Sequence, residues 1–339
     1  MAAATSCQNG VFHSPVHIMN THTVLVIADP ADPRLAMLAQ LPEGTAIAVG
    51  AEPEAFENLA PEADAILNWA LSNRTLRAIF PRRPRLRWVH TRAAGVDNML
   101  FPELVESPVT FTNGTGVYSA SLGEFALAAI LYFAKDLRRM MRSQKAGVWD
   151  PFDVEEIAGK TVGIVGYGDI GRAVASRARA MGMRVMALKR TTQARSDEFA
   201  EWIGGPDRLV ELMAASDYVV AAAPLTPETR GMVGEAQLAA MKPGAVFVNI
   251  GRGPVIDEAA LIRALTERRI KGAALDVFET EPLPAGHAFY SMENVLLSPH
   301  CADHTADWQA NAMRFFLEQF ERFRKGEPLR NAVDKRRGY

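Results

Sequence analysis

Three polar side chains, Arg252, Glu281 and His300, are of types that can carry out acid–base chemistry together. Each lies in or just after a short apolar run that we interpret as a buried strand. In an open α/β sheet, ligands bind beyond the carboxyl ends of the strands, so we expect these side chains to converge. A protonated histidine can donate a proton, a carboxylate can raise its pKa, and a guanidinium can pair with a substrate carboxylate or polarise a carbonyl. This set is what reduction of a 2-keto acid by hydride transfer requires.

Taken singly, each of these residues also has a purely structural interpretation. Arg252 could cap a turn, Glu281 could lie in a solvent-exposed loop, and His300 could be a core histidine with satisfied hydrogen bonds. The three residues alone leave this choice open, so the catalytic hypothesis depends on the rest of the chain.

A glycine-rich loop after the apolar run 161–165 is the strongest single motif. In its G-x-G-x-x-G spacing, the first glycine permits a tight turn, the second lets the backbone approach a pyrophosphate, and the third lets the following helix pack closely. The helix N-terminus offers free N–H groups to phosphates. Because a strand precedes the loop and a helix follows it, we predict dinucleotide binding rather than an ordinary glycine turn. The expected contacts are Gly166, Tyr167, Gly168, Asp169, Ile170 and Gly171.

The end of the next predicted strand, residues 184–188, bears on the choice between NAD and NADP. An acidic residue there would hydrogen-bond the ribose 2′-hydroxyl of NAD. This chain instead has Lys189, Arg190 and Thr191, whose cations and hydroxyl suit a 2′-phosphate. We therefore predict that NADP(H) is preferred and NAD(H) is possible, the alternative being a solvated basic loop that merely tolerates NADP.

The elements that must position these residues alternate between short apolar runs and helical patterns. Runs that are apolar on both faces are typical of parallel strands covered by helices, which predicts an α/β fold. Ten such runs over this length indicate two sheets. The predicted strands are residues 23–29, 45–50, 63–69, 86–90, 161–165, 184–188, 217–223, 245–250, 273–277 and 294–297.

Two long helical patterns, at about residues 119–143 and 306–324, are candidates for the connections between two domains. The first is the longest uninterrupted helical pattern and contains Leu122, Phe125, Ala126, Ile130, Leu131 and Phe133. The second has an apolar stripe at helical spacing, which we expect to be buried. That stripe consists of Trp308, Met313, Phe316 and Phe320.

The bulk composition indicates a globular protein and excludes several classes of partner. The chain has 339 residues, 48% hydrophobic and 22% charged, and this length favours two domains. Its formal charge of −2 gives no electrostatic reason to expect nucleic acid or an anionic membrane as a partner. No apolar run approaches the roughly 20 residues that cross a bilayer.

The two cysteines, Cys7 and Cys301, are far apart in the sequence and suggest neither a disulfide framework nor a metal site. We therefore expect a reducing compartment, the cytoplasm, and no metal. Residues 1–22 contain no acidic residue, no arginine and no long apolar core. We interpret them as a disordered extension in preference to a targeting segment.

Together, the ordered motifs resemble those of the D-isomer-specific 2-hydroxyacid dehydrogenase family. After the glycine loop come Asn-Ile-Gly-Arg-Gly, Leu-Asp-Val-Phe-Glu-Thr-Glu-Pro-Leu and Ser-Pro-His, in that order. The resemblance covers nearly the whole chain from about Thr23, including residues 92–97, 224–229 and 328–331. Within the family, the basic end of the second strand is similar to that of NADPH-using glyoxylate/hydroxypyruvate reductases.

The resemblance implies a role for each matching residue. It implies that Arg252 binds the substrate, that His300 is the general acid/base, and that Glu281, not Glu279, pairs with the histidine. The backbone N–H groups of the loop at Ala94, Gly95 and Val96 would hold the substrate carboxylate, and Tyr118 would face the substrate. Asp276 would contact the nicotinamide carboxamide, and the remaining cofactor contacts would be Pro224, Ile250 and Gly251.

The resemblance also implies a domain organisation. A Rossmann cofactor domain, residues 119–301, would be inserted into a flavodoxin-like substrate domain made of residues 1–118 and 302–339. Both would be doubly wound parallel-sheet domains, with the active site in the cleft between them, and closure of the cleft would exclude water. The family typically forms homodimers through the cofactor domain.

The sequence departs from the family pattern after His300, where the family more often has small neutral residues. Asp303 and His304 would either line the substrate pocket or pack at the hinge. We interpret Cys301 as a small packed residue rather than a nucleophile.

The main hypothesis is therefore an NADPH-preferring reductase of a small 2-keto acid such as glyoxylate or hydroxypyruvate. A second is a non-enzymatic NAD(H)-sensing binding protein of the corepressor type, which keeps the same three residues. A third is a dehydrogenase of another small anion. The basic residues at the second strand end and the lack of long disordered tails favour the metabolic enzyme.

Overall fold

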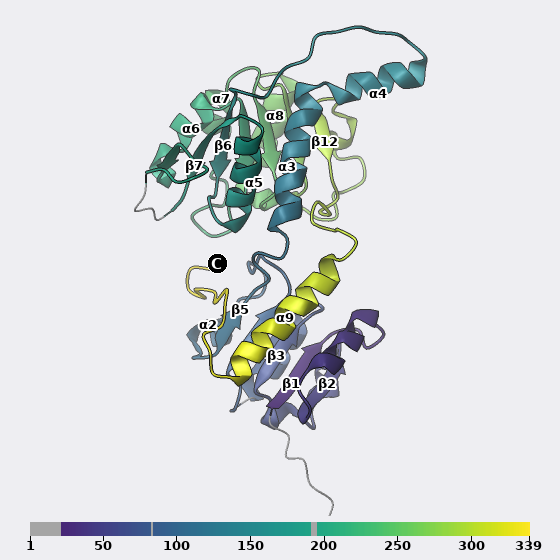
Figure 1. Ribbon diagram of the computed structural model, residues 1–339, viewed down its shortest axis with the longest axis vertical. Helices are drawn as coiled ribbons and strands as arrows, with labels where there is room; N and C mark the ends of the chain where they lie inside the picture. The colour runs from purple at the N-terminus through teal and green to yellow at the C-terminus, as the bar shows by residue number, and fades with distance from the viewer. Residues whose placement is uncertain (1–21, 83, 191–194) are drawn as a thin grey trace, which may run out of the picture.

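The computed structural model describes residues 22–82, 84–190 and 195–339. Within these residues the chain forms two lobes, each built on one parallel sheet (Figure 1). Cys7 and Thr191, which the sequence analysis singled out, lie outside the described residues, as does nearly all of the segment 1–22.

The first lobe contains a five-stranded parallel sheet with the order β2-β1-β3-β4-β5. This is the flavodoxin-like order, in which the chain reverses direction across the sheet between β1 and β3. Its strands are β1 (His22–Ile27), β2 (Thr45–Gly50), β3 (Ala65–Asn68), β4 (Trp88–Thr91) and β5 (Thr110–Thr112). Helix α9 (Trp308–Arg324), near the end of the chain, packs on this sheet, with the rings of Trp88 and Phe316 stacked at a centroid distance of 5.4 Å.

The second lobe contains a seven-stranded parallel sheet with the order β12-β11-β10-β9-β6-β7-β8. The order reverses between β6 and β9, as in a Rossmann sheet, so a crevice for a ligand is expected beyond the carboxyl ends of these two strands. The strands are β6 (Thr161–Val165), β7 (Arg184–Leu188), β8 (Trp202–Gly204), β9 (Tyr218–Ala221), β10 (Val246–Asn249), β11 (Gly272–Leu275) and β12 (Val295–Leu297).

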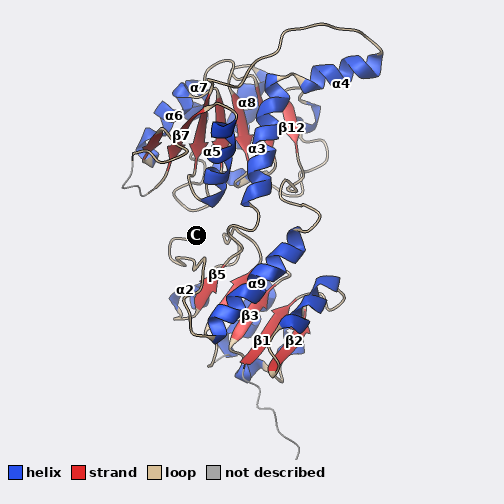
Figure 2. Cartoon of the chain, in the orientation of Figure 1, coloured by secondary structure: helices blue, strands red, loops and turns tan. Residues whose placement is uncertain are grey.

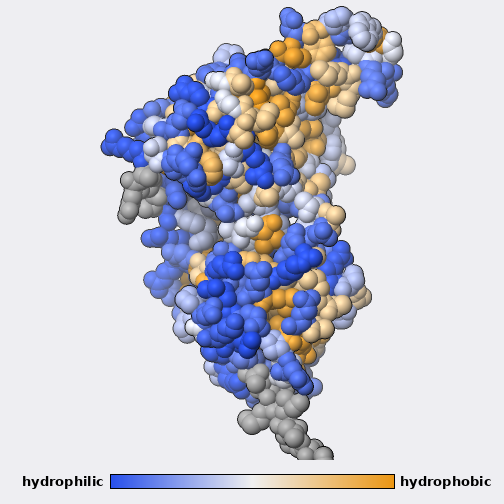
Figure 3. All heavy atoms as spheres, in the orientation of Figure 1, coloured by the Kyte–Doolittle hydropathy of each residue, from blue (hydrophilic) through white to orange (hydrophobic). Residues whose placement is uncertain are grey.

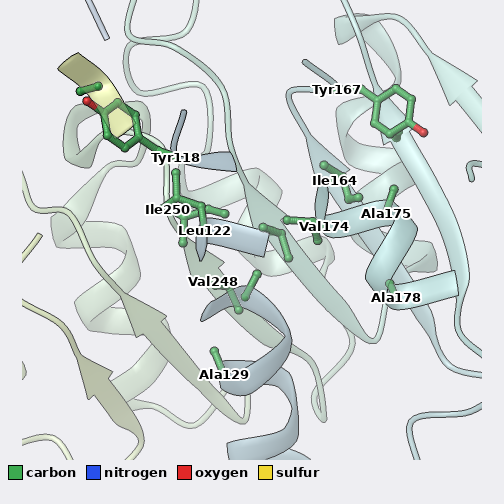
Figure 4. Close-up of a cluster of buried hydrophobic side chains, with 14 of the residues drawn as sticks. Tyr118, Leu122, Ala129, Ile164, Tyr167, Val174, Ala175, Ala178, Val248 and Ile250 are labelled. Carbon is green, nitrogen blue, oxygen red and sulfur yellow. The ribbon is translucent and has the colours of Figure 1, made fainter. Parts of the chain in front are cut away.

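Helices cover both faces of the second sheet (Figure 2). On one face, α3 and α5 bury Leu122, Ala129, Val174 and Ala175 against side chains of β6 and β10 (Figure 4). The α-helices of the described residues besides α9 are α1 (Asn73–Ile79), α2 (Pro102–Glu106), α3 (Ser119–Ala134), α4 (Leu137–Ala146), α5 (Asp169–Ala180), α6 (Leu209–Ala215), α7 (Glu235–Ala240) and α8 (Glu258–Thr266).

The structure confirms the predicted fold class and all ten predicted strands. It adds β5 and β8, each of only three residues, too short for a periodic pattern. The predicted stripe of α9 is confirmed at Met313, Phe316 and Phe320, which are fully buried. Trp308 begins the helix and is only half-buried.

The prediction of one uninterrupted helix over residues 119–143 was wrong. Helix α3 ends at Ala134, and Asp136 adopts the left-handed conformation with φ of 46°. The Asp136 carboxylate then accepts a hydrogen bond from the N–H of Arg139, at 3.3 Å, and caps α4. An aspartate tolerates this conformation and makes a good N-cap, so the chain turns here although the composition favours a continuous helix.

Candidate active site

A cleft of about 970 Å³ lies between the two lobes, where the carboxyl ends of both sheets meet. The first lobe contributes the loops after β3, β4 and β5, and the second contributes the loops after β6, β9, β10, β11 and β12. The cleft brings together most of the predicted site residues. Those that line it are Ala94, Gly95, Val96, Tyr118, Gly168, Asp169, Ile170, Pro224, Ile250, Gly251, Arg252, Asp276, Glu281 and His300.

His300 and Glu281 form a close pair in the cleft. The Nδ1 atom of His300 lies 2.6 Å from Oε2 of Glu281, and the other carboxylate oxygen accepts a hydrogen bond of 2.9 Å from the N–H of Phe278. The carboxylate is thus held from both sides. Because Nδ1 donates to Glu281, the Nε2 atom of His300 is the nitrogen left for a ligand.

Asp276 fixes the turn that presents His300. Its buried carboxylate accepts hydrogen bonds from the hydroxyl of Ser298 and from the N–H groups of Cys301 and Ala302, at 2.6, 3.0 and 3.1 Å. His300 itself has φ of 51°, an uncommon conformation for a residue other than glycine. The surrounding hydrogen bonds therefore stabilise the His300 backbone in a conformation that neither a helix nor a strand contains.

The electrostatics of the pair favour a charged histidine. The hydrogen bond to Glu281 raises the pKa of His300, and this effect outweighs the opposing effects of burial and of the nearby Arg252. Burial would raise the pKa of Glu281, but the hydrogen bonds from His300 and from the Phe278 N–H together lower it. The site therefore keeps an imidazolium–carboxylate pair to higher pH than an isolated histidine would allow.

Arg252 is held across the cleft by the opposite lobe. Its Nε donates to Oδ1 of Asp97 at 3.0 Å, and its Nη1 donates to the carbonyl of Gly251 at 2.8 Å. The guanidinium lies against Gly95 so closely that a Cβ on that glycine would be 1.5 Å from Nη2. The Arg252 guanidinium occupies the space that a side chain at position 95 would need, which explains the glycine there. The guanidinium lies beside the loop at residues 93–96.

That loop has free donors. No hydrogen bond within the described residues is donated by the N–H groups of Ala94, Gly95 or Val96. The loop is fixed from behind, because the side-chain amide of Asn113 donates to the carbonyl of Ala94 at 2.6 Å. Free backbone N–H groups next to a guanidinium form a site suited to a carboxylate.

Tyr118 is largely buried at the edge of the same pocket. Its hydroxyl donates to the carbonyl of Arg92 at 2.6 Å, and burial raises its pKa well above the usual value for tyrosine. The hydroxyl is therefore a neutral donor that braces the loop, with its ring lining the cleft.

Arg92, which lines the cleft, and its buried partner Trp69 were not predicted from the sequence to belong to this region. The Arg92 guanidinium lies between the rings of Trp69 and Trp308, 5.1 Å from each centroid, and Nε donates to the carbonyl of Trp69 at 2.5 Å. An arginine between two tryptophans joins the loop after β4 to the start of α9. The motif around residues 92–97 marked the region, but the aromatic partners come from distant parts of the chain.

Asp303 and His304 were expected either to line the substrate pocket or to pack at the hinge. In the structure both residues line the cleft. The ring of His304 stacks on Trp308 at 4.3 Å, and burial raises the pKa of Asp303. Cys301 does not line the cleft, and its Sγ lies 3.6 Å from the hydroxyl of Ser298. It is packed behind the histidine.

The glycine loop has the shape required for a pyrophosphate. Gly166 has φ of 100°, and a Cβ there would clash with the backbone at Ala223, at 2.6 Å. A Cβ on Gly171 would lie 2.3 Å from the carbonyl of Gly166, so the helix packs closely as predicted. A Cβ on Gly168 would meet no atom within 4 Å, so this glycine faces the open cleft. The missing side chain at Gly168 thus leaves room in the cleft for a ligand and does not serve packing within the protein.

Two other predicted residues of the glycine loop use their side chains elsewhere. The Tyr167 side chain is buried, with its hydroxyl 2.9 Å from Oδ1 of Asp197, and in Figure 4 it points away from the other labelled residues. Only its backbone is available to a cofactor. The Asp169 carboxylate accepts a hydrogen bond from the hydroxyl of Ser119 at the start of α3.

Lys189 and Arg190 follow β7 directly and are exposed, in the position expected for contacts to the ribose. Arg190 lies with its Cζ 4.7 Å from the ring centroid of Tyr339, a residue of the opposite lobe.

Among the described residues, no group of three or more His, Cys, Asp and Glu side chains is arranged to hold a metal ion. No helix in this part of the chain has both the length and the apolar character to cross a membrane.

Comparison with known proteins agrees with this geometry. The family model described as "D-isomer specific 2-hydroxyacid dehydrogenase, NAD binding domain" matches residues 127–302. A glyoxylate reductase of Thermococcus gammatolerans is 36% identical over 283 residues, covering 81% of this chain and 84% of that protein.

Two solved structures are similar over almost their whole length. One is a D-isomer specific 2-hydroxyacid dehydrogenase of Xanthobacter autotrophicus Py2 in complex with NADPH and MES, with a TM-score of 0.80, 33% identity, and coverage of 94% of this chain and 99% of that one. The other is an NADPH-dependent glyoxylate/hydroxypyruvate reductase of Sinorhizobium meliloti in complex with NADP and sulfate, with a TM-score of 0.80, 28% identity, and coverage of 94% and 100%.

The two-sheet fold and the glycine loop define a dinucleotide-binding oxidoreductase. More particularly, the chain belongs to the D-isomer specific 2-hydroxyacid dehydrogenase family, and the resemblance inferred from its motifs is confirmed. Its cofactor is accordingly a nicotinamide dinucleotide.

Proposed function

We propose that this protein reduces a small 2-keto acid, of the glyoxylate or hydroxypyruvate type, to the D-2-hydroxy acid with NADPH as the preferred cofactor. The observation that carries the proposal is the placement of the His300–Glu281 pair and Arg252 in one cleft with the free N–H groups of residues 94–96. This arrangement provides a proton donor and a carboxylate-binding site together. The named relatives support the same substrate class.

In this proposal each side chain of the cleft has one task. The N–H groups of residues 94–96 and the guanidinium of Arg252 bind the substrate carboxylate and orient the carbonyl. Reduced nicotinamide supplies the hydride when it is bound. His300 donates the Nε2 proton to the carbonyl oxygen, on which negative charge develops, and Glu281 stabilises the imidazolium through Nδ1. The residues of the glycine loop and Pro224, Ile250, Gly251 and Asp276 would hold the cofactor.

The direct test follows NADPH and NADH absorbance separately with purified protein and a panel of 2-keto acids led by glyoxylate and hydroxypyruvate. Oxidation of NADPH with one small keto acid, at a kcat/KM well above that with NADH, is the expected result. No turnover across the panel, with cofactor still bound, would refute the proposed reaction.

The substitution Glu281→Gln should shift the pH dependence of reduction to lower pH. Reduction requires protonated His300, so the rate declines as pH rises through the pKa of this histidine. The carboxylate raises that pKa, and an amide of the same size cannot stabilise the imidazolium, so the decline should begin at lower pH. Profiles of kcat/KM against pH measure the shift.

Glu279→Gln is the matched control for this prediction, because Glu279 also lines the cleft but, within the described residues, forms no hydrogen bond or ion pair with His300. Its profile should coincide with that of the wild type. An unmoved profile for Glu281→Gln would show that the pair does not set the pKa of the catalytic acid.

Replacing Lys189 and Arg190 together by alanine should selectively weaken NADPH binding. Each charge-assisted contact to the 2′-phosphate is worth about 1.5–3 kcal/mol, so the loss should be at least tenfold in Kd for NADPH, with little change for NADH. Fluorescence titration of both cofactors checks this. Equal losses for the two cofactors would exclude a 2′-phosphate site at these residues.

The assembly and domain boundaries are further parts of the proposal. We propose a homodimer formed through α3 and α4, with residues 119–301 as the cofactor domain and residues 1–118 and 302–339 as the substrate domain. Hydrophobic residues gather over α3 on the surface of the upper lobe (Figure 3). No residue of α4 is buried, and Met140, Met141 and Trp149 on and after it are exposed, Trp149 to 95%. Such a surface is usually covered by a partner.

We also propose a cytoplasmic location, which the low number of cysteines supports.

A further inference from the structure

The last residues of the sequence cross the cleft and contact the proposed 2′-phosphate site. Gly338 and Tyr339 line the cleft, and the Tyr339 ring lies under the guanidinium of Arg190, whose Cζ is 4.7 Å from the ring centroid. Arg190 belongs to the second lobe, whereas the segment that carries Tyr339 is fixed to the first lobe. The pair is therefore a contact between the lobes at the cofactor end of the cleft.

The first lobe holds this segment firmly. The ammonium group of Lys335 donates hydrogen bonds to the carbonyls of Leu104, Ser107 and Val109, at 2.9, 2.6 and 2.8 Å. Just before it, the N–H of Val333 donates to the carbonyl of Phe111, at 2.8 Å, beside β5. These bonds anchor the segment to the edge of the five-stranded sheet.

A tight turn then sets the position of the tyrosine. The carbonyl of Asp334 accepts hydrogen bonds from the N–H groups of Arg337 and Gly338, at 3.0 and 2.9 Å, and the N–H of Asp334 donates to the carbonyl of Tyr339 at 3.1 Å. Gly338 has φ of 80°, which a side chain would disfavour, so the turn depends on this glycine. Tyr339 is therefore presented to Arg190 by a closed, anchored turn.

We infer that Tyr339 is a positioning residue for NADPH, which orients the Arg190 guanidinium toward the 2′-phosphate from the opposite lobe. The inference rests on the proposed role of Arg190 in NADPH binding. An exposed arginine loses much side-chain freedom when it binds a phosphate. Stacking on an aromatic ring fixes the guanidinium plane beforehand and leaves its in-plane N–H groups free for the phosphate. No motif in the sequence pointed to Tyr339.

The test measures Kd for NADPH and for NADH by fluorescence titration of the full chain. Cation–π contacts at exposed sites are worth about 0.5–1 kcal/mol, so Tyr339→Ala should raise the Kd for NADPH about two- to fivefold and leave that for NADH unchanged. Tyr339→Phe, which keeps the ring, should bind both cofactors like the wild type. Arg336→Ala is the control in the same segment, because Arg336 is exposed and pairs with Glu106, on the first lobe.

A double-mutant cycle separates the positioning role from other effects. In an Arg190→Ala background, Tyr339→Ala should have no further effect on NADPH binding, because the tyrosine acts through the arginine. A full additional loss in that background, equal losses for NADPH and NADH, or tighter NADPH binding by Tyr339→Ala would each overturn the inference. If Arg190→Ala weakens NADPH but Tyr339→Ala does not, only the inference fails. If Arg190→Ala has no effect on NADPH, the proposed cofactor preference fails as well.

Discussion

His300→Ala is expected to lower kcat for 2-keto acid reduction by about 10²- to 10⁴-fold, the usual contribution of a positioned general acid. The imidazolium is the proton donor of the proposed reaction, and alanine offers no replacement at Nε2. Glu281 cannot take over, because its carboxylate lies at Nδ1 of His300, 2.6 Å from that atom, and not at the Nε2 position from which the proton is proposed to pass to the substrate. The Kd for NADPH should stay within about twofold of the wild type, since the glycine loop that forms the phosphate site is unaffected. Single-turnover absorbance measurements give the rate, and fluorescence titration gives the Kd.

His287→Ala provides the matched control for the loss of an imidazole. His287 pairs with Glu258 at 3.1 Å and does not line the cleft, so kcat should be preserved. A His300→Ala protein that retains most of its turnover would refute the general-acid role. A protein that loses NADPH affinity instead would place this histidine in cofactor binding.

The strands and the catalytic motifs were predictable because their signals are local. Each long strand is a continuous apolar run between loops, and His300 follows such a run within three residues, at the carboxyl end of β12. The glycine loop combines a left-handed turn at Gly166, which favours glycine, with a Gly168 that leaves the cleft open. Physical requirements confined to a few neighbouring residues can be read directly from the sequence.

Features that depend on distant parts of the chain were not predictable in this way. The break after α3 is a local exception, because it depends on the backbone conformation of the single residue Asp136 while the helical pattern of the sequence continues through it. Arg92 acquires its environment from Trp69 and Trp308, which lie 23 residues before it and 216 after it in the numbering. Tyr339 meets Arg190 only because the final segment returns to β5 and turns back across the cleft. Such contacts are created by the topology of the two sheets rather than by any sequence period.

Arg252→Lys is expected to lower kcat/KM for the keto acid by about 10²- to 10³-fold, although the positive charge is conserved. The guanidinium has three directions in use: Nε contacts Asp97, Nη1 contacts the carbonyl of Gly251, and Nη2 lies against Gly95 beside the free N–H groups of the loop. A lysine ammonium is a single point donor and cannot keep both anchors while facing a carboxylate. Loss of a hydrogen bond to a charged group costs about 1.5–3 kcal/mol, and misplacement of a bound substrate by about 1 Å can cost roughly 10²-fold in rate.

Steady-state kinetics with the preferred keto acid, together with the Kd for NADPH, tests this prediction. Arg263→Lys is the control, because Arg263 is an exposed arginine of α8 that pairs with Glu235 away from the cleft, and its kinetics should match the wild type. An unchanged kcat/KM for Arg252→Lys would show that only the charge at this position matters. A parallel loss of NADPH affinity would mean that Arg252 acts on the cofactor. The expected result is a lower kcat/KM for the keto acid with an unchanged Kd for NADPH. It would show that the substrate needs a planar donor, which the contacts of Arg252 with Asp97 and Gly251 hold between the two lobes.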